Sequence, residues 1–315
     1  MTVCIPISAA SAGPKEDAVH SPELSDEAFV AEIERRVQDT ITRFSLFTNK
    51  DRILVAASGG KDSMALAHML KRFGYPIEAV TVNAHIGCYT DENLRNLRTV
   101  CEQQQIPLHE ISFRKEFGGA LCTIRDTINK GGEGLSSCAV CGTFRRYLLN
   151  KRSVELNGDV LALGHNLDDE AQAFFMNLIG NKLELSARMG PSTGERKSAT
   201  MVPRVKPLYF VSEQEIIRYV KILKFPVHIG KCPCSLDGQR NFVKDLFNDL
   251  ETKHPGTKQK VIAYFLKKKD GLQSMFKGQP QIDCESCGEA SSKGTCRSCQ
   301  LLEMYNTQRA SAQSL

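Results

Sequence analysis

A short apolar run leads directly into a glycine-rich turn, and this junction limits the folds available to the chain. Residues 53–57 read Ile-Leu-Val-Ala-Ala, and residues 58–63 read Ser-Gly-Gly-Lys-Asp-Ser. The pattern predicts a buried strand, a sharp turn and then a helix. Backbone N–H groups of such a turn, the helix N-terminus and the Lys61 ammonium all attract an anion. The junction therefore predicts a phosphate-binding site in a fold that alternates strands and helices.

The alternation continues along the chain and predicts an α/β fold with a doubly wound parallel sheet. Strands are expected at 53–57, 77–83, 108–112 and 160–163. Helices are expected at 62–73, 91–104, 141–156 and 167–179, with an irregular stretch before 141. Ligands of such sheets bind at the carboxyl ends of the strands, where Gly59, His85 and Gly164 fall.

The remaining segments predict further helices around this sheet. A helix is expected from 26 to 45, with Ser25 or Asp26 as its N-cap, and another at 212–224, where Ser212 and Glu215 form a capping box. Residues 181–204 resemble a loop, and 240–252 and 257–268 predict two more helices. The expected division is a flexible tail (1–25), an N-terminal helix (26–50), a catalytic domain (51–225), a helical region (226–278), a cysteine module (279–302) and a second tail (303–315).

Composition restricts where the protein works and what it binds. The 315-residue chain has no apolar run long enough for a bilayer and no secretory signal, so a cytoplasmic protein without membrane association is expected. Twelve cysteines in such a protein indicate metal or redox chemistry. Basic residues cluster at 145–152 and 253–269, which suits a nucleic-acid backbone or, alternatively, a solvated helix face.

Two Cys-x-x-Cys pairs close to the C-terminus predict a metal site. Eight residues separate Cys284-x-x-Cys287 from Cys296-x-x-Cys299. Each pair can hold a metal through a tight turn, and four thiolates at this spacing are typical of structural zinc. We therefore expect a small zinc-ribbon-like module with no open coordination position.

A third pair, Cys138-x-x-Cys141, has no second pair beside it. It lies at the expected start of a helix and is followed by Arg145 and Arg146, which should lower the thiol pKa values. With a third thiol from Cys232 or Cys234, three thiolates could hold an iron–sulfur cluster with one iron open. A redox disulfide and a zinc site that uses all four of these cysteines remain alternatives.

Residues 164–172 read Gly-His-Asn-Leu-Asp-Asp-Glu-Ala-Gln and place carboxylates at another strand-to-helix junction. Asp168, Asp169 and Glu170 could simply stabilise the positive end of the helix. Alternatively, one of them binds magnesium or acts on the substrate at the nucleotide site. His85 and His165, at strand ends, are either site residues or polar core residues.

Together these motifs resemble the TtcA/TtuA family of tRNA thiolation enzymes, within the PP-loop ATP pyrophosphatase superfamily with its adenine-nucleotide α-hydrolase-like fold. The Cys138 and Gly164 motifs and the terminal cysteine module are more similar to the TtuA and wobble-uridine branch. The resemblance implies that ATP adenylates the C2 oxygen of a tRNA uridine and that sulfur replaces this oxygen. The alternative is a PP-loop sulfurtransferase that uses a cysteine persulfide or acts on an acceptor other than tRNA. It also implies a [4Fe–4S] cluster, a ubiquitin-like thiocarboxylate protein as sulfur donor, and a possible homodimer.

The resemblance implies roles for particular residues. Catalytic or cluster-holding roles fall to Asp169, Arg145, Cys138, Cys141 and Cys232. Contacts to ATP, with Mg²⁺, are expected from Ala57, Ser58, Gly59, Gly60, Lys61, Asp62, Ser63, His85, Ile86, Gly164 and Asp169. One departure concerns the N-terminus, where relatives of this branch carry another zinc finger but this chain offers only Cys4 and His20.

Overall fold

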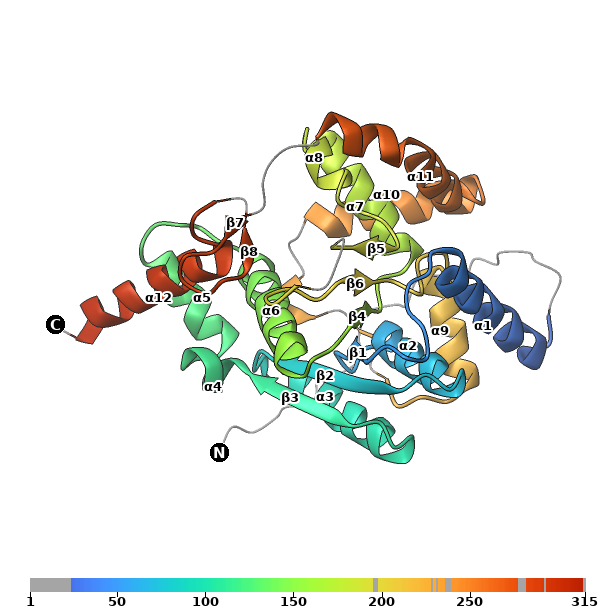
Figure 1. Cartoon of the computed structure of the whole chain (residues 1–315), viewed down its shortest axis with the longest axis horizontal. Coiled ribbons are helices and arrows are strands. Elements are labelled where there is room, and N and C mark those ends of the chain that lie inside the picture. Colours follow the sequence, from blue (N-terminus) through green and yellow to red (C-terminus); the bar gives the residue numbers. More distant parts are fainter. Residues whose placement is uncertain are drawn as a thin grey trace.

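A computed structural model describes residues 24–194, 198–227, 229–230, 232–235, 239–276, 282–291 and 293–313. A sheet occupies the centre of the molecule, with helices on both of its faces and a separate group of helices beyond one edge (Figure 1). The expected tail at 1–25 lies almost entirely outside the described residues, as do Cys4 and His20. None of the helices in the described part of the chain has the length and apolar composition that a bilayer crossing requires.

The sheet has six strands in the order β3-β2-β1-β4-β6-β5, and the predicted doubly wound parallel sheet is confirmed. The strands are β1 (Ile53–Ala56), β2 (Ile77–Asn83), β3 (Leu108–Ser112), β4 (Val160–Leu163), β5 (Ser192–Thr193) and β6 (Arg204–Val205). All neighbours run parallel except β5, which is antiparallel to β6. Because β1 lies between β2 and β4, the loops that follow these three strands meet at one edge of the sheet.

Alternate residues of the strands face two separate hydrophobic cores. Ile53 and Val55 pack with one group of helices and Leu54 packs with the other, and all three are fully buried. Burial of each such side chain stabilises the fold by about 1.5–3 kcal/mol. The first face is covered by α1 (Asp26–Arg43), α2 (Lys61–Arg72), α3 (Gly87–Gln103) and α9 (Glu213–Ile222). The second is covered by α4 (Phe113–Phe117), α5 (Leu121–Asn129), α6 (Ser137–Glu155) and α12 (Arg297–Gln313).

A third group of helices lies beyond the β4–β6 side of the sheet, at the top of Figure 1. It consists of α7 (Leu167–Ile179), α8 (Leu183–Ser186), α10 (Gln239–Lys253) and α11 (Thr257–Met275). A small core around Leu167, Phe247 and Ile262 holds the group together. The 3₁₀ turn η1 (Pro233–Ser235) contacts α6, and the short strands β7 (Ile282–Asp283) and β8 (Ala290–Ser291) pair within the cysteine module.

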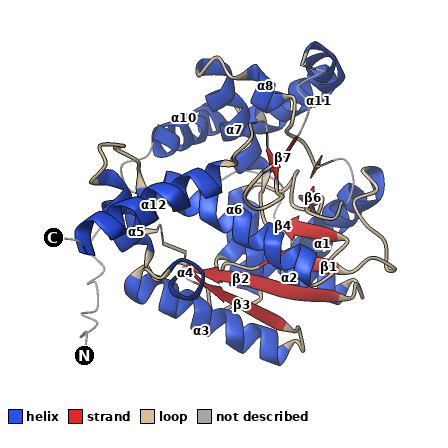
Figure 2. Ribbon diagram, turned by 60° about the vertical axis from the view of Figure 1, so that its left-hand side comes forward, coloured by secondary structure: helices blue, strands red, loops and turns tan. Residues whose placement is uncertain are grey.

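Three sequence predictions are wrong. Residues 181–204 were expected to form a loop, yet they include α8 and β5. The stretch before residue 141 was expected to be irregular, yet it forms α4 and α5, whose Phe113, Phe117 and Ile124 are buried. The expected tail at 303–315 is instead the greater part of α12, which packs beside α5 (Figure 2). The tail becomes helical because Leu301 and Tyr305, each 1 % exposed, enter the second core.

Candidate functional site

The glycine-rich turn after β1 is held in shape by its own two serines. The Ser58 N–H donates to Ser63 Oγ at 3.1 Å, and Ser63 Oγ donates to the Gly60 carbonyl at 3.1 Å. Gly59 has φ of +78°, and a Cβ there would lie 2.2 Å from the carbonyl oxygen of Asn93. Glycine is therefore required at position 59. The first N–H groups of α2 have no partners within the helix and are free to bind an anion.

Lys61 begins α2 and is held by two carboxylates. Its Nζ lies 3.0 Å from Asp62 and 2.9 Å from Glu213, and Glu213 also pairs with Lys244 at 2.5 Å. Burial opposes the charge of Lys61, but the two carboxylates outweigh it and raise the pKa of this lysine. Burial alone would raise the pKa of Glu213, but Lys61 and Lys244 outweigh it and lower this pKa to about 2. The motif analysis did not identify Glu213, because nothing near it in the sequence indicates a contact with the loop.

The loop after β4 packs directly on the loop after β1. A Cβ at Gly164 would lie 3.0 Å from backbone atoms of Asp62 and Ser63, so any other residue would push the two loops apart by a few tenths of an ångström. Asn166 caps α7 and donates from Nδ2 to Asp62 Oδ1 at 3.0 Å. Asp169 completes the capping box. Burial is the main cause of the raised pKa of Asp62, and the nearby carboxylate of Asp169 raises this pKa further. Gly164 and Asp169 therefore lie beside the glycine-rich turn, as the sequence predicts.

The carboxylates of the first turn of α7 have three different surroundings. Asp169 faces the loop and also binds Arg240 of α10 at 2.7 Å. Asp168 forms a buried ion pair with Lys258 at 2.5 Å, and its other oxygen accepts from the Glu213 N–H at 2.8 Å. Glu170 forms a second buried pair, with Lys206 at 2.7 Å. Asp168 and Glu170 thus stabilise the helix junction, whereas Asp169 alone remains at the site.

The end of β2 forms the third side of the site. Ile86 lines a cavity there, and its N–H donates to Thr90 Oγ1 at 2.9 Å. His85 has φ of +54°, and its Nε2 lies 2.7 Å from Ser112 Oγ on β3. Burial and the charge of Arg114 lower the pKa of His85, which favours the neutral form of its ring. Ala57, after β1, is buried below the loop.

One cavity of about 340 Å³ joins the glycine-rich turn to the lone Cys-x-x-Cys pair. Ser58 lines one side, and Cys138, Cys141 and Arg145 of α6 line the other, together with Cys232. The Nε atom of Arg145 is buried and has no hydrogen-bond partner among the described residues. Further lining residues come from α3, namely Tyr89, Thr90, Asn93 and Leu94, and the sequence analysis did not identify them. The structure therefore places Ser58 of the glycine-rich turn and the predicted thiols on one cavity.

The thiols around this cavity are more widely spaced than the ligands of a single metal ion. Among the described residues they include no set of three whose sulfur atoms all lie within 4.8 Å of one another. Sulfur atoms on a tetrahedral zinc are about 3.8 Å apart, so this arrangement disfavours the zinc alternative and suits a larger group. The prediction of lowered thiol pKa values is wrong here. Burial raises the pKa of Cys141, and the Arg145 guanidinium offsets it only in part.

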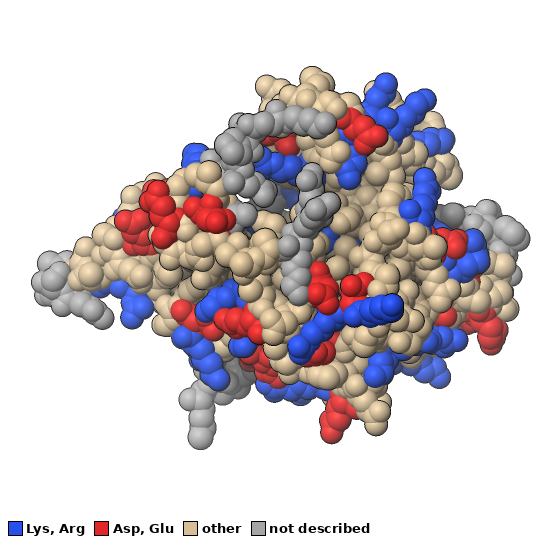
Figure 3. Space-filling model, viewed as in Figure 1, with Lys and Arg blue, Asp and Glu red and all other residues tan. Residues whose placement is uncertain are grey.

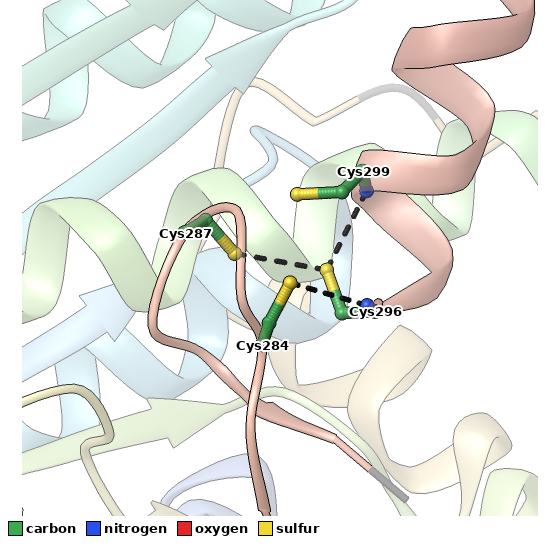
Figure 4. A group of neighbouring side chains, drawn as sticks. All are labelled: Cys284, Cys287, Cys296 and Cys299. Atoms are coloured by element: carbon green, nitrogen blue, oxygen red, sulfur yellow. Dashed lines mark hydrogen bonds between the residues drawn. The ribbon is translucent and has the colours of Figure 1, made fainter. Parts of the chain in front are cut away.

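The carboxy-terminal cysteines form a compact tetrad. In Figure 4 the sulfur atoms of Cys284, Cys287, Cys296 and Cys299 point toward one another, and all lie within 4.8 Å. The Cys287 and Cys296 sulfurs are 3.7 Å apart, close to the ~3.8 Å spacing of zinc ligands. Burial alone would raise the pKa of the Cys284 thiol. Hydrogen bonds from backbone N–H groups, chiefly that of Cys296, outweigh burial and lower this pKa to about 6. The geometry suits four thiolates on one zinc ion.

The basic clusters of the sequence separate in the structure. Lysine and arginine side chains gather over α11, at the upper right of Figure 3. Lys258 is not among the exposed ones, because it is buried with Asp168. In the other cluster Lys151 pairs with Glu116 at 3.1 Å and Arg152 with Glu155 at 3.1 Å. The exposed part of α11 is thus the stronger candidate for a nucleic-acid contact.

Comparisons with known proteins agree with this geometry. The family model of the PP-loop domain matches residues 30–248. The tRNA-5-methyluridine(54) 2-sulfurtransferase of Pyrococcus horikoshii is 32% identical over 283 residues, which cover 89% of this chain and 88% of that protein. The Cytoplasmic tRNA 2-thiolation protein 1 of Drosophila mojavensis is 31% identical over 292 residues, or 90% of this chain and 82% of that protein.

A solved structure is also similar over most of its length. The U34-tRNA thiolase NcsA from Methanococcus maripaludis, solved with its [4Fe-4S] cluster, matches with a TM-score of 0.73 and 29% identity. The match covers 88% of each chain. From the family match, the relatives and this structure, the chain belongs to the PP-loop family of tRNA 2-thiolation proteins.

Proposed function

We propose that the protein uses ATP to activate the C2 oxygen of a tRNA uridine and replaces that oxygen with sulfur. The observation that carries the proposal is the single cavity between the phosphate-binding turn and the Cys138–Cys141 pair. An enzyme that adenylates a base and then delivers sulfur to it needs both groups within reach of one atom. The names of the relatives, 2-sulfurtransferase and 2-thiolation protein, support the same reaction.

In the activation step the uridine C2 oxygen attacks the α-phosphorus of ATP. A new P–O bond forms, the bond to the β-phosphate oxygen breaks, and pyrophosphate leaves. The loop N–H groups and Lys61 hold the phosphates, where they stabilise the charge that develops on the leaving group. The charges of Asp62 and Asp169 interact at this point, and we assign to these two carboxylates the Mg²⁺ that neutralises pyrophosphate.

In the second step sulfur forms a bond to C2, the C2–O bond breaks and AMP leaves. Cys138, Cys141 and Cys232 fit a [4Fe–4S] cluster, because they surround a cavity and are spaced too widely for a single ion. When bound through three thiolates, such a cluster supplies an open iron that can hold sulfide. Arg145 lines the same cavity with an unpartnered Nε, where its charge stabilises an anionic sulfur or the adenylated base.

Other parts of the protein take supporting roles in this proposal. The Cys284 tetrad holds zinc, and the exposed basic side of α11 contacts the tRNA backbone. A ubiquitin-like protein with a C-terminal thiocarboxylate donates sulfur, in the cytoplasm, to a chain that forms a homodimer. Pull-down with such a carrier and the molar mass in solution test the last two points directly.

Metal analysis combined with a thiolation assay tests the proposal. Wild type, Cys138→Ala and the control Cys101→Ala, which removes a buried thiol of the first core, are purified without oxygen. We expect about four irons and about one zinc per chain in wild type and control, and only the zinc in Cys138→Ala. ATP-dependent formation of 2-thiouridine in tRNA should follow the iron. About two zincs per chain with no iron, or no thiolation by the iron-loaded protein, would refute the proposal.

A further inference from the structure

The first two turns of α10 carry basic side chains to the glycine-rich turn, and the proposed function gives these side chains no role. Arg240 Nη2 lies 2.7 Å from Asp169, and Arg240 Nε donates to Gln172 at 3.2 Å. Lys244, four residues further along the helix, lies 2.5 Å from Glu213. Residues four apart lie on the same side of a helix, so one face of α10 supplies both cations.

The charges around the glycine-rich turn balance only when the cations of α10 are counted. Three carboxylates surround the turn, those of Asp62, Asp169 and Glu213. The turn itself contributes the ammonium group of Lys61, which leaves two of the three negative charges over. This excess would repel the phosphates of ATP, and Arg240 and Lys244 remove it. A polyphosphate site at this turn therefore needs the cations of α10.

Arg240 can exchange its carboxylate partner for another anion. Its side chain is 51 % exposed, and an exposed ion pair contributes little to the stability of a fold. Helix α10 is held in place by other residues, since Val243 and Phe247 are buried in the small core of its helix group. In the proposed function Mg²⁺ binds Asp169, and the Arg240 guanidinium then becomes available to a phosphate.

The position of these groups relative to the cavity indicates which part of ATP they meet. Ser58 lines the cavity, but within the described part of the chain its lining includes neither the two cations of α10 nor the three carboxylates. The α-phosphate must face the cavity, because the uridine and the sulfur react there. The β- and γ-phosphates then extend away from it, toward Asp62 and Asp169. Arg240 already contacts Asp169, so it lies within reach of these two phosphates.

We propose that Arg240 binds the pyrophosphate part of ATP and holds it as the leaving group during adenylation. Lys244 is a positioning residue in this proposal, because it neutralises Glu213 and so leaves the charge of Lys61 for the same phosphates. The proposal rests on the proposed function, which sets the direction of ATP in the site. A guanidinium suits this role, since it donates two parallel hydrogen bonds to phosphate oxygens.

Binding of inorganic pyrophosphate, ATP and AMP to the full chain tests the proposal. Affinities are measured by calorimetry with Mg²⁺ and without tRNA. Arg240→Ala should bind pyrophosphate and ATP about tenfold or more weakly, because a hydrogen bond between charged groups is lost. Its affinity for AMP should change by less than about twofold, since AMP lacks the phosphates that Arg240 holds. Arg240→Lys should recover part of the loss, because it keeps the charge but not the paired hydrogen bonds.

The matched control is Lys253→Met, which removes an exposed cation from the other end of α10. It should bind all three ligands as wild type does. The melting temperature of each variant shows whether the chain is folded.

A second comparison separates direct contact with phosphate from an effect through Asp169. Arg240→Ala also leaves the Asp169 carboxylate without its partner, and this charge alone could repel pyrophosphate. Asp169→Asn is therefore compared with the double variant Asp169→Asn/Arg240→Ala, both without Mg²⁺. Direct contact predicts that the double variant binds pyrophosphate about tenfold or more weakly than Asp169→Asn. Equal affinities of these two variants would overturn the proposal.

The remaining outcomes separate this proposal from the function itself. If Arg240→Ala binds pyrophosphate as wild type does, or loses AMP and pyrophosphate in the same proportion, the role of Arg240 is wrong even when the protein thiolates tRNA. If the loss is selective for pyrophosphate and ATP but tRNA is never thiolated, the role of Arg240 stands and the proposed function fails.

Discussion

The buried ion pair between Lys258 and Asp168 joins the α10–α11 helices to the junction that carries Asp169. Both side chains are about 5 % exposed or less, and within the described part of the chain Asp168 keeps the hydrogen bond from the Glu213 N–H if the lysine is removed. Lys258→Met therefore leaves a buried carboxylate without its counter-charge, which costs about 3–5 kcal/mol. Unfolding entropy of ~2.1 cal/mol/K per residue gives about 0.66 kcal/mol/K for 315 residues. The melting temperature should fall by about 5–8 °C.

Thermal and urea unfolding of three variants tests this estimate. Lys253→Met is the matched control, because Lys253 pairs with Asp249 at 2.8 Å but both side chains are more than half exposed. It should lower the melting temperature by less than about 1 °C. Adding Asp168→Asn to Lys258→Met should recover at least about half of the lost melting temperature. The buried negative charge is then gone, and the asparagine side-chain oxygen still accepts from the Glu213 N–H. A melting temperature of Lys258→Met within about 1 °C of wild type would contradict the reasoning.

Three further predictions concern the site. Gly59→Ala should weaken ATP binding by about tenfold or more, because the added Cβ meets the Asn93 carbonyl. Gly74→Ala is the control, since Gly74 also has positive φ but open space around it, and this variant should bind ATP normally. Equal ATP affinities of the two variants in a titration would exclude the steric argument. The Glu213 pKa of about 2 lies below the ordinary 4.5, so its stabilisation is fully present above pH 4.5 and is lost as the pH falls toward 2. Glu213→Gln should accordingly show a flatter loss of stability over this range, and an unchanged acid profile would disprove it. Cys296→Ser should remove the zinc and make α12 sensitive to limited proteolysis. A variant that has lost its zinc but resists proteolysis as well as wild type would argue against a structural role of the metal.

Local signals in the sequence predicted the elements that local forces determine. The strands at 77–83 and 160–163 have the predicted bounds, because continuous β-branched and apolar residues between turns suit a strand covered on both faces. The Ser212–Glu215 capping box is present as expected, and three residues suffice to specify it. The glycine-rich turn and the cysteine tetrad were also predictable, since each depends on spacing within a few residues.

Features that depend on distant partners could not be predicted in this way. Helices α4 and α5 are short and surrounded by glycines, so their apolar periodicity was too brief to recognise. Glu213 contacts Lys61 only because α9 packs against α2. The thiol pKa values were predicted from the helix N-terminus and the arginines alone, but the burial of Cys141 outweighs both, and burial is a property of the folded chain.

Helix α12 also has a consequence for the order in which the chain folds during synthesis. It closes the second core with Leu301 and Tyr305, near the end of the sequence, against α5 and α6 from its middle. The ribosome must therefore release every residue through Tyr305 before this apolar surface can be covered. Until then the nascent protein exposes the apolar core against which Cys141 of α6 packs, and a chaperone bound there would cover this thiol and the unfinished core together.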